Sequence, residues 1–92
     1  MAIEMRTVIQ GASPEQMQAL IAQVGDKMKT FPGFIAHASG PIEGGFHVTE
    51  LWESQEVHER WVREVVAPAM QQMGGGQVPP VQYLPADSVI TR

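Results

Sequence analysis

The chain contains no cysteine, so a disulfide framework, a thiolate nucleophile and a cysteine-based zinc site are all excluded. Positive charge is also scarce, because only six Lys and Arg residues are scattered along it and the net charge is −4. Nucleic-acid surfaces need clustered basic side chains, so a nucleic-acid partner is disfavoured. No apolar run approaches the ~20 residues of a membrane-spanning helix, and the start of the chain lacks the pattern of a secretory signal. We therefore expect a cytoplasmic protein with no membrane partner.

What the chain does contain is the composition of one folded domain over residues 1–92. A hydrophobic fraction of 43% with 17% charged residues is typical of a compact domain rather than a disordered segment. A chain of this length buries only roughly 60–65% of the surface that its unfolded form exposes, so a monomer is only marginally stable. The length therefore favours a homodimer.

Residues 2–10 alternate between apolar and polar side chains, which predicts a half-buried strand. A helix is predicted over residues 13–30, because Ser13 is a good N-cap and Pro14 suits the first helical position. The apolar residues of this helix recur at helical spacing and form one stripe. The stripe consists of Met17, Leu20, Ile21, Val24 and Met28.

Two further strands are predicted over residues 33–40 and 45–52, joined by a turn over residues 40–45 that is rich in glycine and proline. A second helix follows over residues 54–73, with Ser54 as its N-cap. We expect Pro68 to kink or interrupt this helix, because proline has no amide hydrogen and clashes with the preceding turn.

The last part of the chain predicts a loop or lid over residues 74–80 and a weaker strand over residues 80–92. Pro85 restricts that strand to a sheet edge or a bulge. The order strand, helix, strand, strand, helix, strand closes most simply as a ferredoxin-like split β-α-β-β-α-β fold of the α+β class. Its antiparallel four-stranded sheet has two helices on one face. Apolar residues on both faces of the strands favour a second subunit on the other face.

Several short motifs resemble the dimeric α/β-barrel superfamily, and within it the small proteins grouped with antibiotic-biosynthesis monooxygenases. The motifs are Pro32-Gly33-Phe34, His37-x-Ser39-Gly40-Pro41, Gly45-Phe46, Trp52-x-Ser54 and Pro68-Ala69. The resemblance covers nearly the whole chain, but it consists of structural residues and specifies the fold better than the reaction. It implies a ferredoxin-like protomer that pairs sheet to sheet, with a pocket between its sheet and helices. Proteins of this fold include cofactor-free oxygenases, haem-degrading enzymes, cyclases, isomerases and lyases, so function has to be argued from the site.

His37 and His47 are the first candidates for catalysis. If Ser39 lies opposite Gly45 across the turn, the two histidines face each other and form a general acid/base pair. A slip of one residue in register places them on opposite faces, and they are then ordinary strand residues. His37 is the stronger candidate because it lies within the motif that resembles the family. Two histidines are an incomplete ligand set, so no metal is expected.

Glu50 lies on the apolar-rich face of its strand, where a carboxylate is either paired or raised in pKa by desolvation. Pairing is favoured, and Arg6 on the first strand is the candidate partner. Trp52, Trp61 and Phe46 are either core residues or walls of a pocket for a planar substrate, and Tyr83 is a candidate hydrogen-bond donor. His58, between two glutamates, is predicted to be solvated.

The sequence supports no cofactor. Haem-degrading members of the resembled group carry a haem-ligating histidine about ten residues after a tryptophan, whereas here Val62 stands at that distance from Trp52. The glycine-rich segment near the C-terminus lacks the lysine and following helix of a nucleotide-binding loop.

The function that these features favour is a small homodimeric, cofactor-independent monooxygenase-like enzyme. Its substrate is a small aromatic or polyketide-like molecule, and a histidine serves as acid/base. Isomerase, lyase or cyclase chemistry would use the same groups. The alternative is a non-catalytic dimer that binds a small ligand or only assembles.

Overall fold

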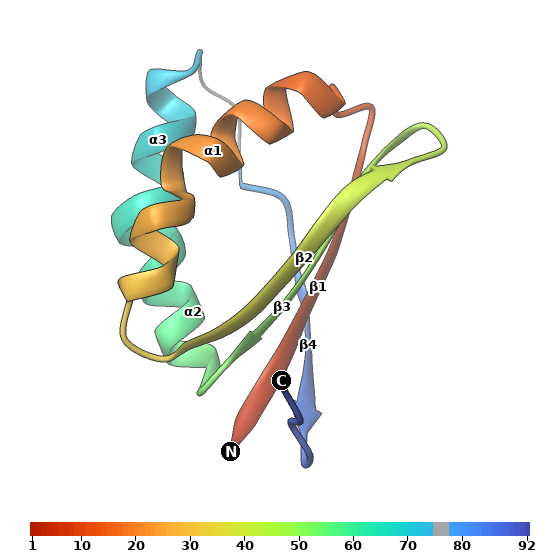
Figure 1. Ribbon diagram of the computed structural model, residues 1–92. Coiled ribbons are helices and arrows are strands. Elements are labelled where there is room, and N and C mark those ends of the chain that lie inside the picture. Colours follow the sequence, from red (N-terminus) through yellow and green to blue (C-terminus); the bar gives the residue numbers. More distant parts are fainter. Residues whose placement is uncertain (75–77) are drawn as a thin grey trace.

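The computed structural model describes residues 1–74 and 78–92 and contains a four-stranded antiparallel sheet with its helices on one face (Figure 1). The strands lie in the order β2-β3-β1-β4, which is the order of the predicted ferredoxin-like fold. The element bounds are β1 Ala2–Gln10, α1 Pro14–Thr30, β2 Phe34–Ile42, β3 Gly45–Trp52, α2 Gln55–Trp61, η1 Val62–Val66, α3 Ala67–Gln72 and β4 Gln82–Ala86.

The first helix begins as its sequence predicts. The Ser13 hydroxyl accepts a hydrogen bond from the Gln16 amide, and Pro14 occupies the first helical position. Val24 and Met28 of the predicted apolar stripe are buried against the sheet and the second helical segment. The helix ends at Thr30, where the amide of Phe31 still bonds to the Met28 carbonyl.

The second helical segment is interrupted, as Pro68 predicts. The α-helix α2 passes into one π-helical turn, η1, in which the Ala67 amide donates to the Val62 carbonyl, and the α-helix then resumes as α3. Pro68 has no amide hydrogen to donate to a carbonyl of the preceding turn, and the π-helical turn lies directly before it, in the segment that its ring would otherwise crowd.

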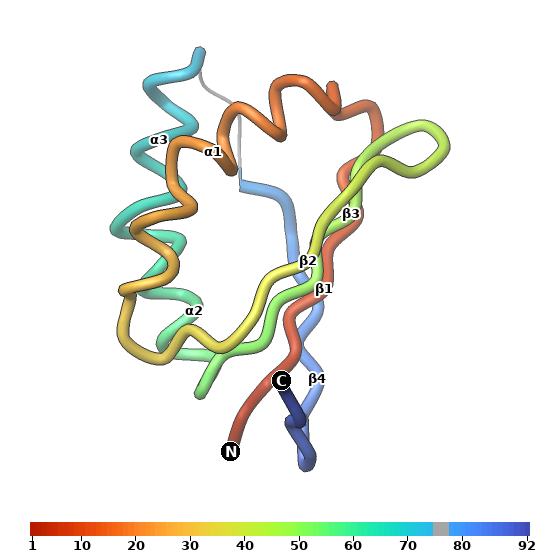
Figure 2. The backbone as a smooth tube through the Cα atoms, viewed as in Figure 1, coloured from red at the N-terminus to blue at the C-terminus, as the bar shows by residue number. Residues whose placement is uncertain are grey.

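The β2–β3 hairpin has a tighter turn than the sequence suggested. Ile42 pairs with Gly45, so only Glu43 and Gly44 connect the strands, and Gly44 has the positive φ of 79° that such a turn requires. Figure 2 shows this hairpin extending away from the helices. Pro41, placed in the turn by the sequence analysis, is a strand residue, which is tolerated because β2 is an edge strand.

Three large aromatic side chains form the centre of the core. Trp52, Trp61 and Phe46 are at most 1% exposed. The rings of Trp52 and Trp61 lie 5.8 Å apart, and Phe31 packs edge-on against both. Both tryptophans are therefore core residues, and Trp61 also lines the cavity described below.

At the C-terminal end of the chain, β4 pairs with β1 only and forms the second sheet edge, where Pro85 is tolerated as predicted. The predicted loop or lid over residues 74–80 includes residues 75–77, which lie outside the described residues. The described part of that segment, at Val78 and Pro79, lines the cavity between sheet and helices.

Candidate active site

A cavity of about 180 Å³ lies between the inner face of the sheet and the helices. Its walls come from β1, β2, β3, the helical segments and the residues before β4, and they are almost entirely apolar. The polar lining residues are Thr7, His37, Glu50 and His58. A few polar side chains converging on an otherwise apolar cavity are the pattern of a candidate small-molecule site.

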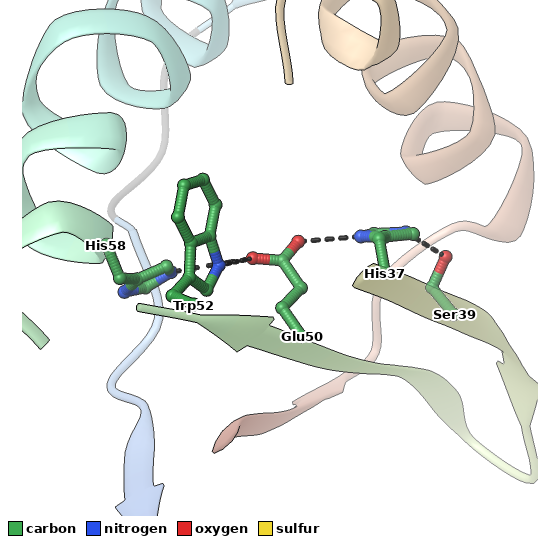
Figure 3. Close-up of polar contacts among 5 residues, drawn as sticks. All are labelled: His37, Ser39, Glu50, Trp52 and His58. Atoms are coloured by element: carbon green, nitrogen blue, oxygen red, sulfur yellow. Dashed lines mark hydrogen bonds and ion pairs between the residues drawn. The ribbon is translucent and has the colours of Figure 1, made fainter. Parts of the chain in front are cut away.

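His37 and Glu50 lie directly opposite each other on β2 and β3, and their side chains point to the same face (Figure 3). The His37 Nδ1 is 2.6 Å from Glu50 Oε2, and the His37 Nε2 is 2.8 Å from the Ser39 hydroxyl. A carboxylate only accepts hydrogen bonds, so Nδ1 of His37 carries a proton. In the neutral form of the ring, Nε2 then holds the lone pair, accepts from Ser39 and is the basic atom of the site.

Glu50 is held at both oxygens. Its side chain is buried, and Oε1 accepts a hydrogen bond of 2.9 Å from the indole Nε1 of Trp52. The expectation that Glu50 is paired is confirmed, but the predicted partner, Arg6, is wrong. Arg6 lies on the other face of β1 and pairs with Glu4, because successive residues of a strand point to opposite faces.

His58 was predicted to be solvated, and that prediction is wrong. It is 2% exposed, and its Nδ1 lies 2.8 Å from the Tyr83 hydroxyl. Its Nε2 lies 3.7 Å from Glu50 Oε1 (Figure 3). His58 precedes the buried Trp61 by three residues, so both side chains lie on the same face of α2. That spacing was the signal in the sequence, and the neighbouring glutamates obscured it.

Burial determines the protonation of the His58–Tyr83 pair. Desolvation lowers the pKa of His58, although the charges of Glu50 and Glu59 oppose this in part. Desolvation, together with the same two carboxylates, raises the pKa of Tyr83. The tyrosine hydroxyl therefore donates to Nδ1 of a neutral His58, whose Nε2–H faces Glu50. Tyr83 does not line the cavity and contacts the site through His58.

His47 is not brought to this site. The observed register places it opposite Gly40, on the face of the sheet away from the helices, so the face-to-face arrangement with His37 is wrong. The cause is the short turn: the pairing differs by three residues from the alignment of Ser39 with Gly45, and an odd shift reverses the face.

The proposed aromatic walls divide into two groups. Trp61 lines the cavity, whereas Trp52 and Phe46 lie in the core beside it. Trp52 still contributes to the site, because its indole donates to Glu50.

Exchanging His58 for Gln is expected to reduce the pH dependence of stability. Because burial lowers the pKa of His58, the unfolded chain takes up a proton there near its ordinary value of about 6.5 while the folded chain does not. The unfolded state then binds more protons, so stability is present above that pH and falls as the pH drops below it. Thermal unfolding at about pH 7.5 and pH 5.5 measures the change. The wild type and a His47→Gln control should lose more stability than His58→Gln, and equal losses in all three would contradict the assignment.

Solved structures with this arrangement of helices and strands share little sequence with the chain. An antibiotic-biosynthesis monooxygenase, assigned as putative, from Chloroflexus aurantiacus superposes with a TM-score of 0.69 at 18% identity, over 99% of this chain and 98% of that one. SnoaB, a cofactor-independent oxygenase from Streptomyces nogalater, in a mutant form, gives 0.67 at 10% identity, over 99% and 97%. A heme-degrading protein from Mycobacterium tuberculosis gives 0.64 at 18% identity, over 99% and 100%.

The chain has the fold of the antibiotic-biosynthesis-monooxygenase-like proteins. The resemblance seen in the sequence motifs is thus confirmed at the level of fold, over nearly the whole length. No protein-family model matches the sequence, and neither does any curated protein.

A haem needs a large cavity and an available axial ligand, and a protein-bound metal ion needs several grouped ligands. The cavity of about 180 Å³ is smaller than the ~300 Å³ at which pockets for drug-sized ligands begin, so a porphyrin does not fit it. His58, the histidine nearest in sequence to the expected haem ligand, directs its Nε2 at Glu50. Within residues 1–74 and 78–92, no three His, Asp or Glu side chains are grouped to hold a metal ion. None of the helices in these ranges is long and apolar enough to cross a membrane.

Proposed function

We propose that this chain is a cofactor-independent, monooxygenase-like enzyme of the cytoplasm that acts on a small electron-rich phenol or enol, with His37 as its base. The observation that carries the proposal is the His37–Glu50 pair at the wall of an apolar cavity. The fold shared with SnoaB, a cofactor-independent oxygenase, supports the same class of reaction.

His37 begins the reaction. The substrate hydroxyl replaces Ser39 as the partner of Nε2 and transfers its proton there, while Glu50 stabilises the imidazolium that forms. The apolar walls exclude water, so the phenolate is poorly solvated and electron-rich. Its ring then reduces dioxygen directly and a C–O bond forms. The peroxide anion takes the proton back from His37. Nε2 then removes the hydrogen of the same ring carbon and passes it to the leaving hydroxide, so the O–O bond breaks, water leaves and a ring carbonyl remains.

The volume of the cavity limits the size of the substrate. Cavities of about 150 Å³ lined by apolar side chains bind benzene. The cavity here, at about 180 Å³, therefore suits one substituted ring rather than the several fused rings of a large polyketide. Trp61 and Met28 supply flat and adaptable contacts for such a ring.

Turnover of a panel of single-ring phenols and enols, measured with an oxygen electrode, tests the proposal. We expect turnover in air, none under argon, and no effect of a chelator. Conversion at the same rate under argon would instead assign the base to an isomerase, lyase or cyclase. Binding without any conversion would favour the non-catalytic ligand-binding alternative.

The outer face of the sheet supports a homodimer that pairs sheet to sheet. Val8 is 54% exposed there, and Leu51 and Leu84 on the same face are only half-buried. A second copy would cover these side chains and add the buried area that a chain of 92 residues lacks. Light scattering at micromolar concentration should give twice the chain mass of 10.1 kDa, and a mass of one chain would contradict the dimer.

A further inference from the structure

Ser39, His37 and Glu50 form a chain of hydrogen bonds in the order of a nucleophile, a base and an acid (Figure 3). The Ser39 hydroxyl is 2.8 Å from Nε2 of His37, and Nδ1 of His37 is 2.6 Å from Oε2 of Glu50. The atoms match those that a serine hydrolase uses, because the hydroxyl hydrogen-bonds to Nε2 and the carboxylate to Nδ1. Both distances are within the range that proton transfer requires.

We propose that Ser39 is a nucleophile for acyl transfer from a small ester or thioester with an apolar acyl group. This goes beyond the proposed oxygenase reaction, although it uses the same His37 and Glu50. It needs neither dioxygen nor an electron-rich ring, and the oxygenase reaction does not need the Ser39 hydroxyl. The two proposals can therefore fail separately.

The position of Ser39 suits a nucleophile better than a buried structural hydroxyl. Ser39 is half-buried, so solvent reaches this residue. Glu50, the acid in this series of hydrogen bonds, is only 4% exposed. Ser39 lies opposite Val48, which lines the cavity, and so faces the same side of the sheet as His37. No strand of the sheet lies on the other side of β2, so an ester can approach Ser39 from that edge.

Glu50, the acid in this series of hydrogen bonds, is held in place before any substrate binds. Trp52 donates to the second oxygen of Glu50, and the neutral His58 presents its Nε2–H to the same oxygen. The Glu50 side chain is therefore oriented with its other oxygen towards Nδ1 of His37. Such an orientation selects the imidazole tautomer whose Nε2 takes the serine proton.

The reaction consists of two balanced transfers. Nε2 of His37 takes the Ser39 proton as Oγ attacks the ester carbonyl, and the alcohol or thiol leaves with that proton, which gives an acyl-serine. Water then attacks the acyl carbonyl, again losing its proton to Nε2, and Ser39 is restored as the carboxylic acid leaves. The cavity of about 180 Å³ accommodates an acyl group of one ring or a short aliphatic chain.

Labelling with an alkyl fluorophosphonate, a reagent for activated serines, tests the proposal in an oxygen-free buffer. Peptide mass spectrometry should place one adduct on Ser39 in the wild type and in the Ser88→Ala control, which removes an exposed serine after β4. We expect no adduct at position 39 in Ser39→Ala, and labelling of Ser39 slowed at least about a hundredfold in His37→Ala. Wild-type protein that stays unlabelled at Ser39, or that labels equally fast without His37, would overturn the proposal.

The absence of cysteine provides a second test that does not depend on the ester. In the S39C variant the only thiol of the chain lies against His37, which should take its proton. Alkylation by iodoacetamide at about pH 6 should therefore be at least roughly tenfold faster than in the S88C control. Circular dichroism establishes that both variants are folded, and equal alkylation rates in folded variants would show that His37 does not activate position 39.

Discussion

Replacement of His37 by Ala is expected to lower kcat by roughly 10²- to 10⁴-fold for whichever phenol the enzyme converts, because the general base is lost. KM should change much less, since the apolar walls that hold the ring are intact. Steady-state oxygen uptake measures both constants. Thermal unfolding of the variant is measured as well, because loss of the fold would also abolish activity.

His47→Ala is the matched control for that experiment. His47 belongs to the same hairpin and is also a histidine, but it lies on the opposite face of the sheet. Its removal should change kcat by less than about threefold, which is a small effect beside the loss of a general base. A variant without His37 that kept wild-type turnover would remove this residue from the chemistry, as would equal losses in the two variants.

Glu50→Gln is expected to reduce kcat by a similar factor, for a reason that depends on hydrogen bonding. Trp52 Nε1 can only donate, so the amide oxygen of the new side chain is drawn to it. The amide NH₂ then faces Nδ1 of His37, which has to accept, and the ring proton moves to Nε2. The lone pair of the base is lost and nothing stabilises an imidazolium, so we expect a loss of roughly 10²- to 10⁴-fold.

Two measurements accompany the Glu50 variant. Glu53→Gln, an exposed position just beyond β3, controls for the loss of one negative charge and should retain wild-type kcat. The pH–rate profile of Glu50→Gln should show no recovery at higher pH, because an amide does not ionise. Wild-type kcat in a folded Glu50→Gln protein would mean that His37 acts without its carboxylate.

Much of the fold could be predicted because the signals are local. The alternation of residues 2–10, the Ser13-Pro14 helix start, the short third strand and the interruption at Pro68 all depend on neighbouring residues. The burial of the two tryptophans follows from their size and position on apolar faces. The order of the elements then left one simple topology, which the structure has.

The candidate site was only partly predictable, because it depends on register and tertiary contact. Whether His37 meets His47 or Glu50 is decided by how many residues the turn uses, and Pro41 made a longer turn plausible although it fits an edge strand. The burial of His58 depends on α2 covering the end of β3, which no local pattern of charges reveals. Four of the residues now placed in one network were candidates, namely His37, Glu50, Trp52 and Tyr83, but the contacts that join them were not predicted.

The central claim is that Glu50 fixes the tautomer of the His37 ring, with a proton on Nδ1 and, in the neutral ring, the lone pair on Nε2 beside Ser39. Nitrogen-15 NMR of histidine-labelled protein tests it without knowledge of the substrate, since protonated and unprotonated ring nitrogens differ widely in chemical shift. In the neutral form of the His37 ring, we expect a protonated Nδ1 and an unprotonated Nε2, with the His37→Ala variant providing the assignment. A His37 ring protonated at Nε2 and bare at Nδ1 would contradict it.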